Sequence, residues 1–568
     1  MQLRTFSLAM MMAFGLQLNA QTLAKEFKAT SEGNPISGSV FCADPTALEY
    51  NGRLYVYGTN DSQEFVANGK KGDNTYGKIK SLVVFSTDDM VNWTFHGTID
   101  VKKICSWSGN SWAPSAVWRT NPETGEDEFF IYFANGGSNV GVLKSTVSPV
   151  GPFKSPNSQA MVNHGMPGVD PCTALFDPGA VIDENGIGWI TVGGYSPNAQ
   201  GTKLQPNNVS IIKLKPSMTA IDGSAVKIPA PYHFEANELN VIGDKYVFTY
   251  CSHWDRNGDE WNVYKKEHNI SASMPGIGTM CYMVSDTPMD PNSWVFKGAY
   301  GPGVSGNNHS HLQKFKGNYY HIYHDHGSVL LDVMKSAGVV DKNTGDFRSI
   351  CVNKATVSES TATVNPVTLN IAGVEQIKSM NPYELQQAET MATCGGVEYE
   401  DFTNIKKNGR INALGNDASE NMQVKMKEGC WTYLRKVNFG SAGASKITLR
   451  AKGEGTIEMR FGRKNAKASA TIDVSSDEMT DITVDVDPTV FTGTKNIFIL
   501  VASGEVYLDV WQATAAQADA IKTIERHQTA AQRYDLSGRR LDNADHRGLL
   551  IEQYQDAQGN THARKRVQ

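Results

Sequence analysis

The stretch Asn51-Gly52-Arg53-Leu54-Tyr55-Val56-Tyr57 sets the pattern that decides the fold, because variants of it recur along the chain. A turn with glycine opens it and an aromatic-rich strand follows, then a second strand at 82–88 that ends in polar residues, and a third at 93–95 that begins with tryptophan. Four further copies have aromatic-rich strands at 129–133, 188–192, 246–250 and 319–323, and second strands at 140–145, 209–214, 280–285 and 331–336.

The spacing of these copies indicates blades of a propeller. They recur every roughly 60 to 75 residues, which is longer than a solenoid repeat and fits a four-stranded blade with its loops. Five such units predict a five-bladed β-propeller over about residues 40–355. A β-sandwich of unrelated hairpins is the alternative, while the glycines and aromatics speak against helical bundles and coiled coils.

Polar residues stand at a common place ahead of the blades, eight or nine residues before the turn glycine: Asp44, Asp177, Glu235 and His309. In blade two the corresponding region is 111–114. Because the innermost strands of a propeller line its central channel, these side chains should converge at one mouth of that channel. A single acidic residue there would usually be a solvated turn residue, but three in one register favour a site.

Three carboxylates with aromatic neighbours are typical of glycoside hydrolysis. One carboxylic acid protonates the leaving oxygen and another activates water or attacks the sugar. A third carboxylate nearby raises the pKa of the acid by like-charge repulsion. Trp112 and Trp254 are candidates for stacking on sugar faces, as are Trp107 and Trp189, although a single tryptophan of this kind is more often a core residue.

The overall charge excludes one class of function. A net charge of −6 and a pI near 6.1, with no basic stripe before the last residues, argue against nucleic-acid binding by phosphate neutralisation. Neutral polysaccharides, which are bound through aromatics and a few carboxylates, suit this surface better.

The N-terminus predicts export. Arg4, an apolar run over 6–18 and Ala20 resemble a signal peptide at 1–20, too short to span a membrane; a buried first strand or helix is the alternative. No other segment could span one. The eight cysteines contain no C-x-x-C pair, which excludes zinc and thioredoxin-like sites, and most should be buried. A Cys394–Cys430 pair stays open.

Several motifs resemble glycoside hydrolase family 43. They are Ala43-Asp44-Pro45, Phe176-Asp177-Pro178, His233-Phe234-Glu235-Ala236, Ser111-Trp112-Ala113-Pro114-Ser115 and Gly306-Asn307-Asn308-His309. The resemblance implies a five-bladed propeller with Asp44 as general base, Glu235 as general acid and Asp177 tuning that acid, by an inverting reaction. It also implies a central calcium held near His309 through water, although a channel histidine bonded to carboxylates is the plainer reading.

Within the family, the arabinoxylan arabinofuranohydrolases are most similar. They imply a secreted enzyme, acting as a monomer, that removes α-L-arabinofuranosyl or β-D-xylosyl units from plant cell-wall polysaccharide. One departure weakens the substrate assignment: those enzymes usually carry an arginine after the Tyr-His strand of the last blade, and 323–328 has none. A non-catalytic polysaccharide-binding propeller is the alternative.

The remaining chain divides in two. We expect the propeller over 21–380, a β-sandwich over 381–513 and a spacer with a C-terminal tail over 514–568. The sandwich resembles carbohydrate-binding module family 6, which implies calcium at Glu389 and Asp509, with Gln387 replacing the usual first acid, and Trp431 as a sugar platform. A purely structural sandwich remains equally open. The tail resembles a Bacteroidetes secretion-sorting segment, or else is a small strand pair or disordered.

Overall fold

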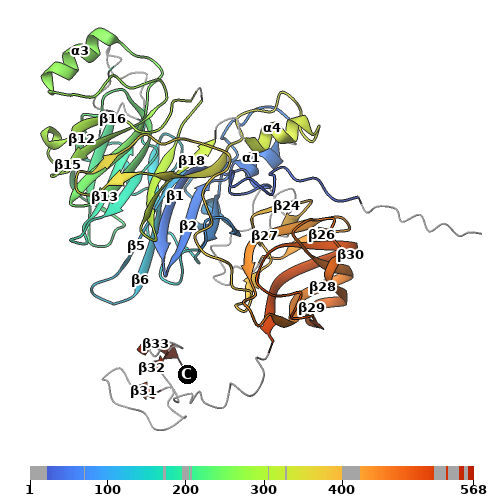
Figure 1. The fold of residues 1–568 in the computed structure, drawn as a ribbon. Coiled ribbons are helices and arrows are strands. Elements are labelled where there is room, and N and C mark those ends of the chain that lie inside the picture. Colours follow the sequence, from blue (N-terminus) through green and yellow to red (C-terminus); the bar gives the residue numbers. More distant parts are fainter. Residues whose placement is uncertain are drawn as a thin grey trace, which may run out of the picture. The chain divides into compact units, whose positions relative to one another are not determined.

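The protein is nearly all β-structure (Figure 1). The computed structural model describes residues 22–68, 71–169, 174–194, 204, 208–304, 306–325, 329–399, 422–516, 532–534, 549–555 and 561–567. The expected signal peptide therefore lies outside the described residues. The chain forms two compact units, Met1–Ala515 and Ala516–Gln568.

Residues 43–355 of the first unit form a five-bladed β-propeller, as the repeat predicted. Blade one holds β1 (Ala43–Tyr50), β2 (Arg53–Thr59), β3 (Leu82–Thr87) and β4 (Trp93–Ile99). Blade two holds β5 (Trp112–Thr120), β6 (Asp127–Ala134), β7 (Asn139–Ser145) and β8 (Val162–Asn163). Blade three holds β9 (Gly179–Ile182), β10 (Gly188–Gly193), β11 (Val209–Leu214) and β12 (Ile221–Ile228). Blade four holds β13 (His233–Ile242), β14 (Lys245–Ser252), β15 (Met280–Ser285) and β16 (Val295–Ala299), and blade five holds β17 (Ser310–Phe315), β18 (Asn318–Asp325) and β19 (Ser349–Ala355).

The opening turn shows why the repeat makes hairpins. Asn51 and Gly52 adopt φ of 50° and 74°, the left-handed pair that a tight hairpin needs and that Asn-Gly supplies at low cost. Tyr50 and Arg53 then face each other as the first pair of β1 and β2.

The innermost strands line the channel, as expected. A cavity of about 410 Å³ is bounded by side chains of β1, β5, β9, β13 and β17, among them Ala47, Ala116, Val181, Leu239 and Leu312. Each blade therefore delivers the start of its first strand to the same mouth.

One strand prediction was wrong. Residues 331–336 belong to the helix α4 (Val329–Ser336), and the third strand of blade five is β19. Leu330 and Leu331 are buried beside Phe41 and Phe65, so the apolar residues that suggested a strand cover one helical face. A short apolar run cannot distinguish the two by periodicity.

Residues 34–36, which precede blade one, pair with the outer strand of blade five. The backbone N–H of Ile36 donates to the carbonyl of Ile350 at 2.8 Å. The amide of Asn34 continues this ladder, donating to the carbonyl of Val352 at 3.1 Å and accepting its N–H at 2.7 Å. The N-terminal segment thus takes the outer position of blade five.

The other helices are short and lie in loops between strands: α1 (Asp61–Ala67), α2 (Val101–Ile104), α3 (Gly258–Glu267) and the 3₁₀ turn η1 (Pro291–Ser293). None of the helices in the described ranges is long and apolar enough to cross a membrane.

A β-sandwich follows the propeller (orange in Figure 1). After a small hairpin of β20 (Val357–Ser358) and β21 (Thr363–Val364) come β22 (Gln386–Gln387), β23 (Thr390–Met391), β24 (Thr393–Gly395), β25 (Glu398–Tyr399), β26 (Val424–Lys427), β27 (Trp431–Asn438), β28 (Ala444–Phe461), β29 (Ala468–Asp485) and β30 (Thr494–Ala515). The second unit contains an antiparallel sheet of β31 (Gln532–Tyr534), β32 (Leu549–Gln555) and β33 (Thr561–Val567). The tail motif at 535–541 lies outside the described residues.

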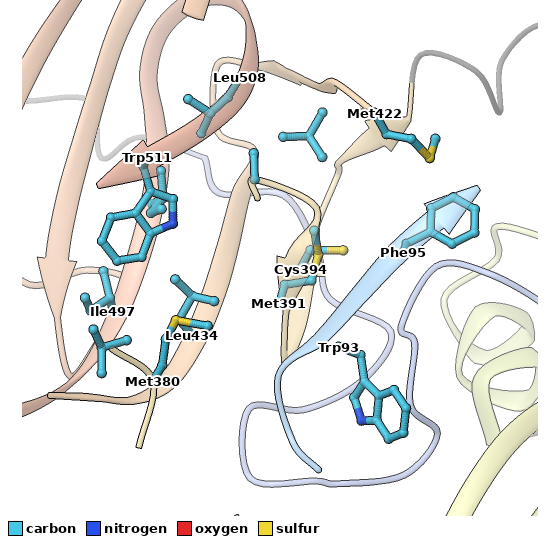
Figure 2. Close-up of a cluster of buried hydrophobic side chains, with 14 of the residues drawn as sticks. Trp93, Phe95, Met380, Met391, Cys394, Met422, Leu434, Ile497, Leu508 and Trp511 are labelled. Carbon is cyan, nitrogen blue, oxygen red and sulfur yellow. The ribbon is translucent and has the colours of Figure 1, made fainter. Parts of the chain in front are cut away.

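Propeller and sandwich share a strand and a core. β23 pairs with β4, placing Thr390 opposite Thr94 and Met391 opposite Trp93. Trp93 and Phe95 belong to the same buried cluster as Met391, Cys394, Leu434 and Trp511 (Figure 2). Burial of large aromatics across such a junction is the dominant stabilising contribution. The sandwich is therefore packed onto blade one as part of the first unit.

The cysteines of the described residues are buried, and none of them forms a disulfide. Cys394 and Cys430 form no disulfide, so the pairing left open by the sequence is absent, and the thiol of Cys430 instead lies 3.1 Å from the carbonyl of Gly396. Cys172 falls outside the described residues.

Candidate active site

A pocket of about 170 Å³ opens at the mouth of the channel. Its lining consists of Asp44, Tyr76, Trp112, Phe176, Asp177, Glu235, Asn307, Asn308, His309, His324 and Arg348. All three predicted catalytic carboxylates and His309 therefore meet in one cavity. They come from the first strands of blades one and four and from the loops before β9 and β17.

The backbone is irregular where these residues enter. Asp44, Ala113, Asp177 and Ala236 all have positive φ, between 39° and 63°. The pairing of β1, β5 and β13 also shifts register at this point. Bulges of this kind re-aim side chains, and strained backbone concentrates at functional sites. Ala113 occupies the equivalent place in blade two, where no carboxylate stands.

Asp44 is held as a charged group. Nη1 of Arg348 donates to its Oδ1 at 2.8 Å, and Nδ1 of His324 lies 3.1 Å from both that oxygen and the backbone nitrogen of Asp44. Although burial alone would raise it, the Arg348 charge and the histidines hold the pKa of Asp44 well below its usual range. Asp44 is thus ionised at neutral pH.

Asp177 and Glu235 have the opposite tendency. Burial, reinforced by the Asp44 charge, raises the pKa of Asp177 to about 7, although its Oδ2 accepts the N–H of Ala236 at 2.8 Å. Burial and the charges of Asp177 and Asp44 raise the pKa of Glu235 well above its usual range. Buried Oε1 of Glu235 has no hydrogen-bond partner in the described part of the chain. At neutral pH, Glu235 is therefore a protonated acid at the pocket wall.

His309 lies between the two aspartates. Its Nδ1 is 3.7 Å from Oδ1 of Asp44 and 3.9 Å from Oδ2 of Asp177, and burial lowers the pKa of His309 to about 3, so the ring is neutral. Calcium prefers about six to eight oxygen ligands. The described residues contain no group of three or more His, Cys, Asp or Glu placed to hold a metal ion. Direct ligation by His309 does not fit, and a water-mediated calcium stays a prediction.

The predicted metal ligands of the sandwich lie in the link between β22 and β23 and within β30. Gln387 faces Val510, which brings buried Glu389 and Asp509 into adjacent positions. Oδ1 of Asp509 has no hydrogen-bond partner among the described residues. Two buried carboxylates suit a hard cation, but they fall short of a ligand set, so calcium stays a prediction here too.

The tryptophans that were predicted to stack on sugars occupy different environments in the structure. Trp112 lines the pocket. Trp254 packs edge-on against Phe234 with ring centroids 4.9 Å apart, beside the Glu235 strand but outside the pocket lining. Trp431 is fully buried, and its Nε1 donates to the carbonyl of Ala24 at 2.9 Å, so its ring cannot serve as a sugar platform. Trp189 is likewise core, and Trp107 stacks on Phe133.

Sequence reasoning missed Arg348, His324, Tyr76 and Asp61. Residues 323–328 carry no arginine, but the pocket lining includes Arg348, which lies after α4 and immediately before β19. Asp61 holds Arg348 by bonds of 2.9 Å to Nε and Nη2.

A pocket at the mouth of a five-bladed propeller, with an ionised carboxylate, a protonated acid and a third carboxyl group beside them, fits the chemistry of a glycosidase. Residues 33–329 match Glycosyl hydrolases family 43. The chain belongs to this family.

Curated relatives extend the similarity beyond the propeller. An arabinoxylan arabinofuranohydrolase of Paenibacillus polymyxa is 32% identical over 86% of this chain and 75% of its own length. One from Bacillus subtilis is 32% identical over 88% of this chain and 96% of its own. The crystal structure of a Bacillus subtilis family 43 arabinoxylan arabinofuranohydrolase in complex with cellotetraose superposes with a TM-score of 0.74 at 30% identity, covering 87% and 99% of the two chains.

Proposed function

We propose that this glycosidase removes α-L-arabinofuranosyl units from arabinoxylan by a single inverting displacement. The observation that carries the mechanism is the division of the pocket into one carboxylate kept charged, Asp44, and one kept protonated, Glu235. The two similar arabinoxylan arabinofuranohydrolases, which align over most of the chain, support the substrate class.

In this proposal Asp44 is the general base. The Arg348 charge keeps its carboxylate ionised, so that it accepts a proton from the attacking water. The water adds to the anomeric carbon on the face opposite the leaving oxygen, which inverts the configuration.

Glu235 is the general acid, and it donates its proton to the glycosidic oxygen as the bond to the anomeric carbon breaks. Asp177 keeps that proton in place, because its charge lies close enough to raise the pKa of Glu235. The proton gained by Asp44 and the proton lost by Glu235 balance, and solvent exchange resets both groups.

The test is release of arabinose from arabinoxylan by the wild type and by Glu235→Gln. Release by the wild type alone supports the proposal, and equal release by both contradicts the role of Glu235. NMR of the newly formed sugar distinguishes the stereochemistry, since retention of the anomeric configuration contradicts a single displacement. Release of xylose instead of arabinose from the same polymer would reassign the substrate to β-D-xylosyl units and leave the mechanism standing.

Export, sugar binding by the sandwich and a monomeric state remain predictions.

A further inference from the structure

The helix α1 carries two buried carboxylates on its first turn, and the mechanism uses only one of them. Asp61 holds Arg348, which holds the proposed base. Glu64, on the same turn, is fully buried as well, yet it lines no part of the pocket. A buried carboxylate is costly unless its oxygens are satisfied, so its partners indicate its purpose.

The partners of Glu64 all belong to one turn of backbone. Oε1 accepts the N–H of Thr75 at 3.1 Å and also the Thr75 hydroxyl, and Oε2 accepts the N–H of Lys78 at 2.7 Å. The Glu64 carboxylate thus binds the backbone N–H groups of Thr75 and Lys78, which flank residues 76 and 77. Charge-assisted hydrogen bonds of this type are stronger than neutral ones.

That turn places Tyr76 in the pocket wall. Tyr76 has a φ of 60°, a conformation that a non-glycine residue adopts only when its surroundings hold it there. The Arg348 guanidinium lies 5.0 Å from the centroid of the Tyr76 ring. The backbone carbonyl of Tyr76 accepts a hydrogen bond from Nε1 of Trp112 at 3.1 Å. Nδ2 of Asn307 approaches its hydroxyl at 3.5 Å.

Tyr76 therefore joins pocket elements from three blades. Arg348 and Asn307 belong to blade five and its preceding loop, Trp112 begins blade two, and the turn itself belongs to blade one. A shift of Tyr76 would alter the width of the pocket on the side of Trp112 and Asn307 without touching the carboxylates Asp177 and Glu235.

We propose that Glu64 is a positioning residue that shapes the sugar pocket through Tyr76, and that this pair sets how tightly the substrate is held. The inference rests on the proposed function for its substrate. Loss of the Glu64 clamp should weaken binding of the sugar in both ground and transition states, so it should raise KM and leave kcat nearly unchanged.

The central test compares Glu64→Gln, Tyr76→Ala and the double variant, using arabinoxylan-derived oligosaccharides. In the Gln variant an amide NH₂ replaces one accepting oxygen, so one of the two backbone contacts is lost. We expect KM to rise roughly tenfold with kcat within about threefold. In the Tyr76→Ala background the same change should have no further effect, because residues that act as one unit are not additive.

Two results would overturn the proposal: a fall in kcat with KM unchanged, or an equal effect of Glu64→Gln with and without Tyr76. Thr75→Val is the milder second variant if Glu64→Gln does not fold, because it removes only the hydroxyl contact; it should raise KM in the same direction. Glu128→Gln is the matched control, since this buried carboxylate pairs with Arg119 and Lys144 on blade two and does not belong to the lining of the sugar pocket. It should leave KM and kcat unchanged.

Hydrogen–deuterium exchange separates this proposal from the proposed function. Backbone amides of 74–80 should exchange faster in Glu64→Gln than in the wild type, and those of blade four should not change. Unchanged exchange of 74–80 overturns the clamp even if the enzyme is active. Faster exchange in a protein that releases no pentose would instead contradict the proposed substrate and leave the clamp intact.

Discussion

Nη1 of Arg348 lies 2.8 Å from Oδ1 of Asp44, so the proposed base is ion-paired inside the pocket. The same guanidinium is held from its other side by Asp61. Because the charge of Asp44 is already compensated, the pocket can tolerate it beside Glu235, which keeps its proton, and Asp177, whose pKa of about 7 leaves it partly ionised at neutral pH. The ion pair thus explains why the three carboxyls differ in protonation.

Removing that guanidinium should destabilise the fold. Arg348→Ala leaves Asp44 and Asp61 buried without their partner, which costs about 3–5 kcal/mol. Arg348→Lys keeps the charge but loses the fork geometry, so it should cost less. Denaturant unfolding at pH 7 measures both, and an alanine variant as stable as the lysine variant would contradict the pairing.

The catalytic carboxylates should be separable from structural ones. Asp44→Asn and Glu235→Gln should each lower kcat by about 10²–10⁴-fold, the usual contribution of a general base or acid. Asp183→Asn is the control, because this aspartate caps the turn before β10 and binds Trp189 at 2.8 Å, away from the pocket. Comparable losses in all three variants would point to misfolding instead of chemistry.

The pH–rate profile should depend on Asp177. Activity needs Glu235 protonated, so it falls as pH rises through the raised pKa of the Asp177–Glu235 pair, while the low pKa of Asp44 leaves no acid limb near neutrality. Asp177→Asn removes a charge that raises the pKa of Glu235. The alkaline limb of kcat/KM should therefore move to lower pH, and an unmoved limb would exclude Asp177 as the tuning group.

The raised pKa of Glu235 should also change how the stability of the fold depends on pH. The folded state holds the Glu235 proton more tightly than the unfolded state, so this residue lowers wild-type stability as pH rises above about 4.3, the ordinary glutamate pKa. Glu235→Gln should thus gain melting temperature relative to the wild type between pH 4 and 8.

Glu128 supplies the opposite control for that measurement. Despite partial burial, its bonds to Lys144 and Arg119 lower the pKa of Glu128, so its stabilisation is present above the unfolded pKa and is lost on acidification. Glu128→Gln should lose melting temperature at neutral pH and approach the wild type in acid. The same trend in both variants would contradict the assignment of Glu235 as the proton-holding group.

The shared core predicts joint unfolding of propeller and sandwich. Trp93→Ala should cost about 3–5 kcal/mol, since the ring is buried between the two. Calorimetry should show a single unfolding transition for the propeller and the sandwich together. As a control, Leu385→Ala at an exposed position of the sandwich should change the free energy of unfolding little. Two separated transitions in the wild type would contradict the shared core.

The sequence allowed prediction of the groups that recur with the blades. Asp44, Asp177 and Glu235 each precede a hairpin whose glycine marks the register, so their convergence followed from the repeat alone. Arg348 and Tyr76 sit in segments that no repeat describes, one after α4 and one in the turn held by Glu64. Their place depends on buried ion pairs and backbone capping between elements distant in sequence.

The sandwich shows a similar limit. Trp431 in a Gly-Cys-Trp-Thr-Tyr strand looks the same whether its ring faces solvent or the core. Only the packing of Ala24 and Phe498 around it decides for the core. The local sequence shows that a large apolar ring is present, but it does not show whether another part of the chain packs over that ring.

The pairing of β23 with β4 also sets the separation between the sandwich and the pocket of the propeller. Two domains joined by a flexible linker meet a polymer with an effective concentration that depends on linker length. Here a strand of the sandwich is hydrogen-bonded into blade one, so its separation from the pocket is set by strand pairing and not by the length of a linker. A polysaccharide lying across both would be engaged at one spacing and one angle only, and the length of chain between branch points would then select among substrates.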